Sequence, residues 1–292
     1  MHEKRSPASM TKIMTLLLTM EALEKEIITY DTIVTVSKNA SDMGGTQIFL
    51  EYGSNVDVLT LIKVIAIASA NDAAVAIAEK IGGTKENFVN MMNDKAKLLG
   101  CKNTNFKNPH GLDEEGHYTT AYDLSLISRE LLKYKEVLKF SSTYEDYITV
   151  SGENHWLVNT NKLIRTYKGA TGLKTGSTGL ALYNLSASAT RNDLSLIAVI
   201  MKAPTTKIRF AEATKLLDYG FANYTSKSFG SKGDVIQRVD VNKGIEAQVN
   251  AILEEDETEM SMNWNKRYRD NMDKMKSGDI YEVADVVRNL SF

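Results

Sequence analysis

A serine and a lysine near the amino terminus have the spacing of a nucleophile and its base. Ser9-Met10-Thr11-Lys12 places a hydroxyl and an ammonium three positions apart, and residues at i and i+3 lie on one face of a helix. A serine hydroxyl needs a nearby base to act as a nucleophile. A lysine can be that base if burial and neighbouring cations lower its pKa, and the positive end of a helix favours the same state. A solvated helix start is the alternative.

Small and polar residues interrupt an apolar helical pattern at Ser69-Ala70-Asn71. Buried hydroxyl and amide groups need hydrogen-bond partners. We therefore expect Ser69 and Asn71 to line a cleft, with Ser69 as a proton relay and Asn71 as a hydrogen-bonding amide. Close packing of two helices over small residues is the alternative interpretation.

A third segment, Lys174-Thr175-Gly176-Ser177, combines a cation and two hydroxyls with a glycine. A glycine allows another backbone to approach closely because it has no side chain. At the edge of a strand, this combination suits an extended peptide that carries a carboxylate. An ordinary turn is the alternative.

The elements that must position these segments are helices and strands in the same stretch of chain. Ser6 and Pro7 are typical of a helix N-cap and a first helical position. Arg191-Asn192-Asp193 predicts a hairpin turn between two alternating strands. Helices mixed with an antiparallel sheet predict an α+β domain over residues 1–222. By apolar spacing, we expect helices at 8–26, 57–81, 86–99, 120–138 and 206–219, and strands at 33–36, 169–175, 180–190 and 193–203.

The remaining chain divides into two parts. Residues 235–252 alternate like two short strands, so residues 223–256 predict the start of a β-rich second domain. An acidic run at 254–257 marks a boundary. Residues 257–292 predict a helical segment, in which 260–292 form two helices broken at 277–279.

Composition excludes several classes of protein. The chain has 35 Lys and Arg against 37 Asp and Glu, a net charge of -2, which excludes a strongly basic nucleic-acid binder as a description of the whole chain. The single cysteine, Cys101, excludes an internal disulfide. The four histidines are scattered, so no Cys/His cluster with zinc spacing exists. Residues 1–5 are charged and the most apolar run, 59–70, contains Lys63, so we expect neither a signal peptide nor a membrane anchor.

In this order, the three segments match the signature of penicillin-binding proteins and class A β-lactamases. Residues 2–254 resemble the low-molecular-mass serine D-alanyl-D-alanine carboxypeptidases, which are penicillin-binding proteins. The resemblance implies an α+β, DD-peptidase/β-lactamase-like domain in which an antiparallel sheet packs with helices. It extends to residues 44–48, 67–73, 108–113, 118–124 and 169–175.

The resemblance implies a role for each residue of the first two segments. Ser9 would be the nucleophile that forms the acyl-enzyme, and Lys12 its general base. Ser69 would relay protons. Asn71 would hold the amide of the substrate peptide.

The resemblance also implies how the third segment would bind substrate. Lys174, Thr175 and Gly176 would bind the end of the peptide that carries the carboxylate. The backbone N–H groups of Ser9 and Ser177 would form the oxyanion hole. Arg209, in the predicted helix after the last strand, matches a family arginine near that carboxylate; a surface charge is the alternative.

The expected activity is removal of the terminal D-alanine from peptidoglycan pentapeptides. It implies β-lactams as covalent inhibitors, no metal or cofactor, and a location in the cell envelope. A β-lactamase is a second reading, but no Glu-x-x-Leu-Asn element lies between Asn71 and Lys174. The family usually has glycine at Ala70. Eight residues precede Ser9, so we also expect the domain to lack its first strands and its export signal.

Residues 257–292 resemble a different family, the helical DNA-binding domain of CarD-type transcription regulators, through segments 263–268 and 276–290. The resemblance implies that Trp264 is a candidate DNA contact that wedges into the minor groove; an anchor in a small helical bundle is the alternative. A DNA-binding protein, or an inactive chimera of two unrelated parts, therefore stands beside the enzyme as a hypothesis. DNA binding by so short and mixed-charge a tail is expected to be weak.

Overall fold

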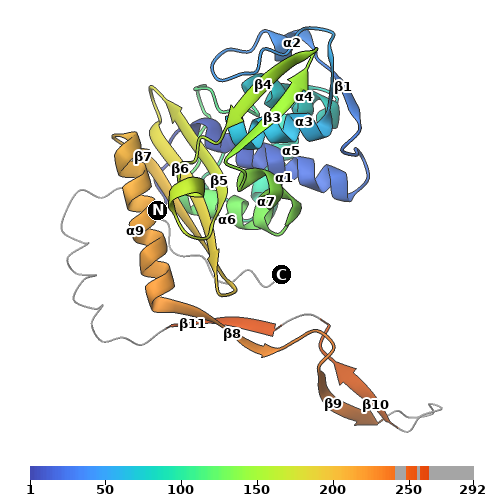
Figure 1. Ribbon diagram of the computed structural model, residues 1–292, viewed down its shortest axis with the longest axis vertical. Helices are drawn as coiled ribbons and strands as arrows, with labels where there is room; N and C mark the ends of the chain where they lie inside the picture. Colours follow the sequence, from blue (N-terminus) through green and yellow to red (C-terminus); the bar gives the residue numbers. More distant parts are fainter. Residues whose placement is uncertain (241–247, 255–256, 263–292) are drawn as a thin grey trace.

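The computed structural model describes residues 1–240, 248–254 and 257–262. A three-stranded antiparallel sheet lies between two groups of helices (Figure 1). The strands are β5 (Ala170–Thr178), β6 (Leu182–Arg191) and β7 (Leu194–Ala203), in the order β5-β6-β7. The predicted α+β class is confirmed.

Both faces of the sheet are buried, and alternate residues of β7 show this. Ile197 and Val199 belong to the larger core with the helices, whereas Leu196 and Ala198 belong to a smaller core with α9 (Thr206–Asn223). Burial on two faces explains why these strands read as nearly continuous apolar runs. The larger core contains α1 (Lys12–Glu24), α4 (Asn71–Gly82), α5 (Lys85–Leu98) and α6 (Ala121–Leu132).

The turn between β6 and β7 is the predicted hairpin turn. Asn192 and Asp193 both have positive φ, at 48° and 60°, which is the backbone of a two-residue type I′ turn. Asn and Asp tolerate this conformation better than most residues. The types of these two residues therefore determine the turn between β6 and β7.

The first helix differs from its prediction at its start. Pro7 rather than Ser6 precedes the helix, which opens as the 3-10 helix η1 (Ala8–Thr11) before α1 continues it. The Ser6 hydroxyl donates instead to the carboxylate of Asp113, at 2.8 Å. A tertiary partner therefore displaces the predicted cap.

The predicted helix over 57–81 is wrong as a single element. The chain forms α3 (Val58–Lys63), a π-helical turn η2 (Val64–Ala68) and then α4. Between them Ser69 adopts a left-handed backbone with φ 70°. The break is stabilised from outside the helix, because the N–H of Asn71 donates to the carbonyl of Thr46 at 2.7 Å.

Shorter elements complete the main body, and the predicted helix over 120–138 divides into α6 and α7. None of the helices in the described part of the chain is both long and apolar enough to cross a bilayer. The elements are β1 (Ile33–Thr35), α2 (Lys38–Ser41), β2 (Asn55–Asp57), α7 (Glu136–Ser141), β3 (Glu145–Val150), β4 (Glu153–Val158) and α8 (Leu163–Thr166).

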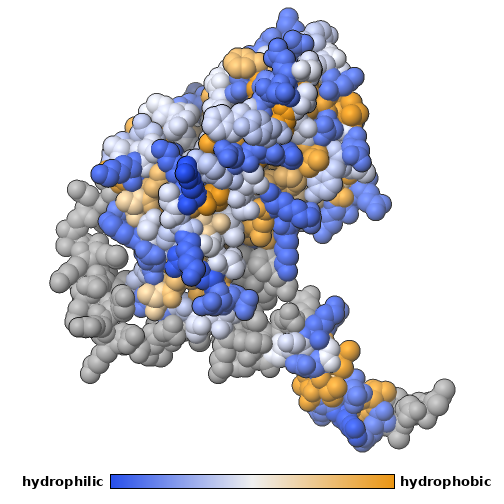
Figure 2. Space-filling model, viewed as in Figure 1, coloured by the Kyte–Doolittle hydropathy of each residue, from blue (hydrophilic) through white to orange (hydrophobic). Residues whose placement is uncertain are grey.

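Two strand pairs follow α9 and extend away from the main body (Figure 1). β9 (Val235–Asp240) pairs with β10 (Gln248–Ile252), which confirms the two strands expected over 235–252. Figure 2 shows hydrophobic residues gathered on this pair, including the exposed Val235 and Ile236.

The second pair includes a strand that begins at residue 257, the predicted boundary. β8 (Tyr224–Gly230) pairs with β11 (Glu257–Met262), so a strand stands where the sequence predicts the start of a helical segment. Antiparallel pairing with β8 satisfies backbone groups that a helix would have satisfied locally. The rest of the predicted helical segment, with Trp264, lies outside the described residues.

Candidate active site

Ser9 and Lys12 meet as their spacing predicts. Ser9 lies in η1 and Lys12 is the first residue of α1, and Lys12 Nζ lies 3.1 Å from Ser9 Oγ. Ser9 is partly exposed, whereas the Lys12 side chain is fully buried. The Ser9 hydroxyl is thus accessible to solvent, whereas the Lys12 amine that contacts it is not.

Two further contacts fix the Lys12 amine. Nζ donates to Asn71 Oδ1 at 2.6 Å and to the carbonyl oxygen of His110 at 2.7 Å. A neutral amine has two hydrogens and one lone pair. If both hydrogens bind these carbonyl oxygens, the lone pair is left for the hydrogen of the Ser9 hydroxyl.

The surroundings of Lys12 favour that neutral amine. Burial lowers the pKa of Lys12 well below its usual value, and the charge of Lys174 lowers it further, against a smaller opposing effect of Asp72. Burial and the charge of Lys174 both disfavour the protonated form. Lys12 is therefore suited to accept a proton from Ser9.

Asn71 is held in one orientation by the loop before α3. Its Nδ2 donates to the carbonyl of Gly44 at 2.7 Å, so its Oδ1 faces Lys12. A Cβ on Gly45 would lie 2.8 Å from Asn71 Nδ2, which explains why a glycine is needed there. Both ends of the carboxamide thus have protein partners. Ser69, at the helix break two residues earlier, is also buried.

The third segment reaches the nucleophile through a glycine. A Cβ on Gly176 would lie 2.8 Å from the carbonyl oxygen of Pro7 and 2.9 Å from the backbone nitrogen of Ser9. Strand β5 can therefore pack against η1 only without a side chain at this position. Ser177, the next residue, is exposed.

Lys174 and Thr175 precede Gly176 in β5 and lie next to its contact with η1. The Thr175 hydroxyl donates to the hydroxyl of Thr160 at 2.7 Å. Lys174 is buried, and burial, together with the charge of Arg209, lowers the pKa of Lys174 to about 7. Two buried cations close to each other have an unfavourable energy that a bound anion would relieve.

Arg209 joins the site from α9, on the far side of the sheet. Its guanidinium donates to the carbonyls of Gly176, at 3.3 Å, and Asn184, at 3.1 Å. Its Nε is buried without a hydrogen-bond partner in the described part of the chain. The structure therefore places this arginine against β5 rather than on the surface, the alternative that the sequence left open.

Sequence reasoning missed several residues that build the site. It included residues 108–113 in the family resemblance but gave no role to the His110 carbonyl. Asn184 was also missed: its Nδ2 donates to the carbonyls of Ser6 and Pro7, at 3.0 and 3.1 Å, and so fastens the nucleophile segment to β6. A buried asparagine inside an apolar strand was the only signal for it.

Two buried histidines near α1 remain uncharged. Burial is the main cause that lowers the pKa of His110 to about 3 and of His117 to about 4. The N–H of Lys107 donates to His117 Nδ1 at 3.0 Å, so His117 Nε2 carries the proton and donates to the Thr11 hydroxyl at 2.8 Å. Among the described residues, no three His, Cys, Asp or Glu side chains are grouped to hold a metal ion.

A serine in contact with a buried lysine, beside a Lys-Thr-Gly strand, is the arrangement that defines the penicillin-binding class. Solved structures of this class share the fold. Penicillin-binding protein 5 from Haemophilus influenzae matches with a TM-score of 0.77 and 33% identity, over 91% of this chain and 78% of that one. Penicillin-binding protein 6B from Escherichia coli matches with a TM-score of 0.73 and 36% identity, over 86% and 78% of the two chains.

The chain belongs to the D-alanyl-D-alanine carboxypeptidase family, whose model matches residues 1–205. The D-alanyl-D-alanine carboxypeptidase DacF of Bacillus subtilis is 51% identical over 83% of this chain and 63% of its own length. DacC of Escherichia coli is 39% identical over 75% of this chain and 56% of its own length. The chain thus spans about six tenths of these relatives. A second model, the C-terminal domain of CarD, matches residues 248–292.

The loop that supplies the His110 carbonyl yields a test of this geometry. Gly111 has φ +94°, and a Cβ there would lie 1.9 Å from the carbonyl oxygen of Ala8. We expect Gly111→Ala to lower the free energy of unfolding by about 2 kcal/mol or more, through backbone strain and overpacking. Urea denaturation measures this loss.

Gly179→Ala is the matched control, because nothing lies within 4 Å of a Cβ at that glycine and its φ is not in the left-handed region. Its stability should stay within about 0.5 kcal/mol of the wild type. Equal losses of unfolding free energy in the two variants would show that Gly111 does not lie in close contact with the backbone of Ala8.

Proposed function

We propose that this protein is a serine-type D-Ala-D-Ala carboxypeptidase that removes the terminal D-alanine from peptidoglycan pentapeptides. The observation that carries the proposal is the buried amine of Lys12, whose two carbonyl acceptors leave its lone pair for Ser9. Family membership supports the same activity.

Acylation begins with attack of Ser9 Oγ on the carbonyl carbon of the penultimate D-alanine, while the hydroxyl proton passes to Lys12. The backbone N–H groups of Ser9 and Ser177 stabilise the resulting oxyanion, and each such donor contributes about 3–4 kcal/mol in other acyl-transfer enzymes. The C–N bond then breaks. The leaving D-alanine takes the proton from Lys12 through the hydroxyl of Ser69.

Deacylation repeats the sequence with water as the nucleophile. Lys12 accepts a proton from the water as it attacks the ester of Ser9, and the proton returns to Ser9 Oγ when the C–O bond breaks. The product is a peptide that is one residue shorter, and the enzyme is regenerated. No metal or cofactor takes part in this scheme.

Lys174, Thr175 and Arg209 bind the terminal carboxylate in this proposal, and Gly176 lets the peptide lie along β5. The support is electrostatic: two cations held close together, with Arg209 Nε lacking a partner in the described part of the chain. In this proposal Asn71 orients Lys12 and also holds the peptide amide. β-Lactams, which carry a carboxylate beside a strained amide, would acylate Ser9 by the same route.

The first test is covalent labelling. Ser9→Ala should abolish the mass shift after incubation with a fluorescent penicillin and abolish D-alanine release from a pentapeptide. Lys12→Ala should nearly abolish both, because the serine loses its base. Ser6→Ala is the matched control, since its hydroxyl faces Asp113 instead of the amine, and it should keep both. Labelling that persists in Ser9→Ala would contradict the assignment.

The second test uses the pKa of Lys174, which is about 7 in the empty site. A lysine with a lowered pKa is charged below that pH and neutral above it, so its attraction for a carboxylate is lost as pH rises from about 6 to 8. We expect Lys174→Ala to lower kcat/KM for D-alanine release roughly ten- to a hundredfold at pH 6. The ratio of kcat/KM between wild type and Lys174→Ala should be smaller at pH 8 than at pH 6.

Exposed Lys168 is the control for this pH series. Lys168→Ala should follow the wild-type profile at every pH. A ratio between wild type and Lys174→Ala that stays constant from pH 6 to 8 would show that Lys174 does not supply the charge for the carboxylate.

We propose that the activity lies in the cell envelope, where its polymeric substrate is found. The carbohydrate-linked peptide is the partner that the site requires. A β-lactamase is the second activity that the same nucleophile could support. In the labelling experiment, slow release of the penicilloyl group indicates a carboxypeptidase, and fast release indicates a β-lactamase.

The carboxy-terminal segment is a separate unit in this proposal. We assign residues 1–222 to the catalytic domain and start a second β-rich unit at 223, which includes Met262 because β11 pairs with β8. The CarD match over residues 248–292 supports DNA contact by Trp264. Every proposed site residue precedes residue 223, so a chain that ends at Met262 should keep full penicillin labelling. Loss of labelling would show that residues 263–292 belong to the enzyme.

A further inference from the structure

The hairpin formed by β3 and β4 presents a pair of aromatic rings to solvent. Tyr147 and Trp156 lie directly opposite each other in the register. Their ring centroids are 6.5 Å apart with an interplanar angle of 17°, yet 68% and 60% of their surfaces are exposed. Large exposed rings gathered on one face usually mark a binding surface.

The same face of the hairpin carries hydrogen-bonding groups beside the rings. Thr149 and Asn154 are the next cross-strand pair on that face, and the Thr149 hydroxyl donates to Asn154 Oδ1 at 2.7 Å. On the other side of the rings, Glu145 pairs with Val158. No Lys or Arg belongs to the residues of this face, so it suits neither nucleic acid nor an anionic lipid surface.

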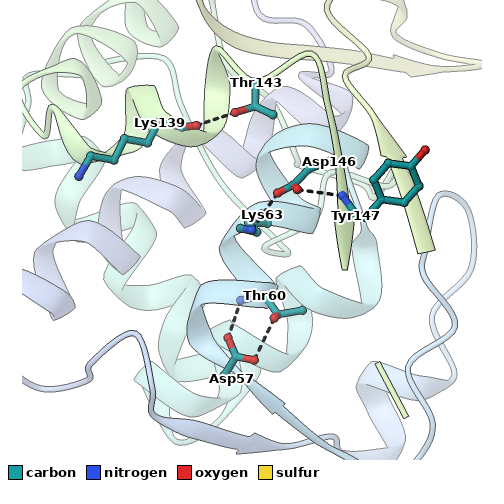
Figure 3. A network of polar contacts seen from close by, with 7 residues as sticks. All are labelled: Asp57, Thr60, Lys63, Lys139, Thr143, Asp146 and Tyr147. Carbon is teal, nitrogen blue, oxygen red and sulfur yellow. Dashed lines mark hydrogen bonds and ion pairs between the residues drawn. The ribbon is translucent and has the colours of Figure 1, made fainter. Parts of the chain in front are cut away.

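The hairpin is held firmly on the main body by its opposite face. Ile148 and Leu157 are buried in the larger core. Figure 3 shows Asp146 reaching α3, where Lys63 lies 2.8 Å from its carboxylate, and accepting the N–H of Tyr147 at 2.8 Å. The ion pair lowers the pKa of Asp146, which keeps this carboxylate charged. The rings therefore stand on a rigid support.

The exposed face also lies close to the candidate active site along the chain. β4 continues directly to Thr160, whose hydroxyl accepts from Thr175 at 2.7 Å and whose N–H donates to the carbonyl of Ile67 at 3.2 Å. From Trp156 to Thr160 the chain covers at most about 14 Å. The rings therefore belong to a strand that leads directly into the residues lining the candidate active site.

We propose that the outer face of the β3–β4 hairpin is a saccharide subsite, which binds the glycan strand that carries the stem peptide. Flat rings stack on the apolar face of a sugar, while adjacent hydroxyl and amide groups bind its hydroxyls. A neutral, polar polymer fits a face with two rings, two hydrogen-bonding side chains and no basic residue. The inference rests on the proposed carboxypeptidase function, because that function supplies the glycan-borne peptide.

The kinetic test compares two substrates of the full chain. One is a soluble pentapeptide ending in D-Ala-D-Ala, and the other is the same peptide carried on uncrosslinked glycan strands. Trp156→Ala and Tyr147→Ala should each raise KM for the polymer roughly two- to tenfold, the worth of one lost aromatic contact. Neither should change kcat, or kcat/KM for the soluble peptide.

Two controls separate binding from structural support. Trp156→Phe keeps a ring and should recover most of the affinity for the polymer. Leu98→Ala removes another highly exposed apolar side chain, at the end of α5, and should behave as wild type on both substrates. If Trp156→Ala weakens both substrates equally, or lowers the melting temperature while Trp156→Phe fails to restore KM, the rings only support the fold and the proposal is wrong.

A direct binding measurement distinguishes failure of this inference from failure of the proposed function. The chain has two tryptophans, so in a Trp264→Phe background Trp156 fluorescence reports stacking alone. Glycan strands freed of stem peptides should change that fluorescence saturably. Activity on both substrates without this change would overturn the saccharide subsite. Saturable binding without D-alanine release from either substrate would overturn the carboxypeptidase function.

Discussion

Two buried amines whose charged forms are both disfavoured are the constraint around which the site is organised. Lys12 and Lys174 are both removed from solvent, and each lacks a carboxylate partner in direct contact among the described residues. Burial of an unpaired ammonium costs several kcal/mol. Burial favours the neutral form of Lys12, which is the form that can accept a proton. Lys174 keeps a pKa of about 7, so an incoming carboxylate can restore its charge.

The packing serves that arrangement by bringing three distant segments into contact. Backbone carbonyls and one carboxamide, rather than charged groups, accept the hydrogens of Lys12. Glycines stand where backbones meet: Gly176 beside the nucleophile helix, and Gly111 beside the carbonyl of Ala8. Each glycine permits an approach that a side chain would forbid. The close contacts and the absence of a charged partner together keep the amine of Lys12 both desolvated and oriented.

The same organisation explains why the site should discriminate among peptides. A free terminal carboxylate relieves the repulsion between Lys174 and Arg209, whereas an amide in its place would leave two buried cations uncompensated. Under the proposed function, recognition of the end of the peptide would thus be electrostatic. The β3–β4 hairpin, in contrast, presents uncharged rings. In our proposal the two surfaces divide recognition between the end of the peptide and the polymer that carries it.

The sequence by itself determined the elements with strong local signals. The spacing of Ser9 and Lys12, the turn at Asn192 and Asp193, and the three segments in family order predicted the fold class and the candidate residues. Tertiary structure decided what local signals cannot encode. The helix break at Ser69, the Lys12 contact with the His110 carbonyl, and the pairing of β11 with β8 all join residues far apart in the chain. Local propensity does not decide the structure at these places, because hydrogen bonds to residues distant in the chain satisfy the backbone or the side chain instead.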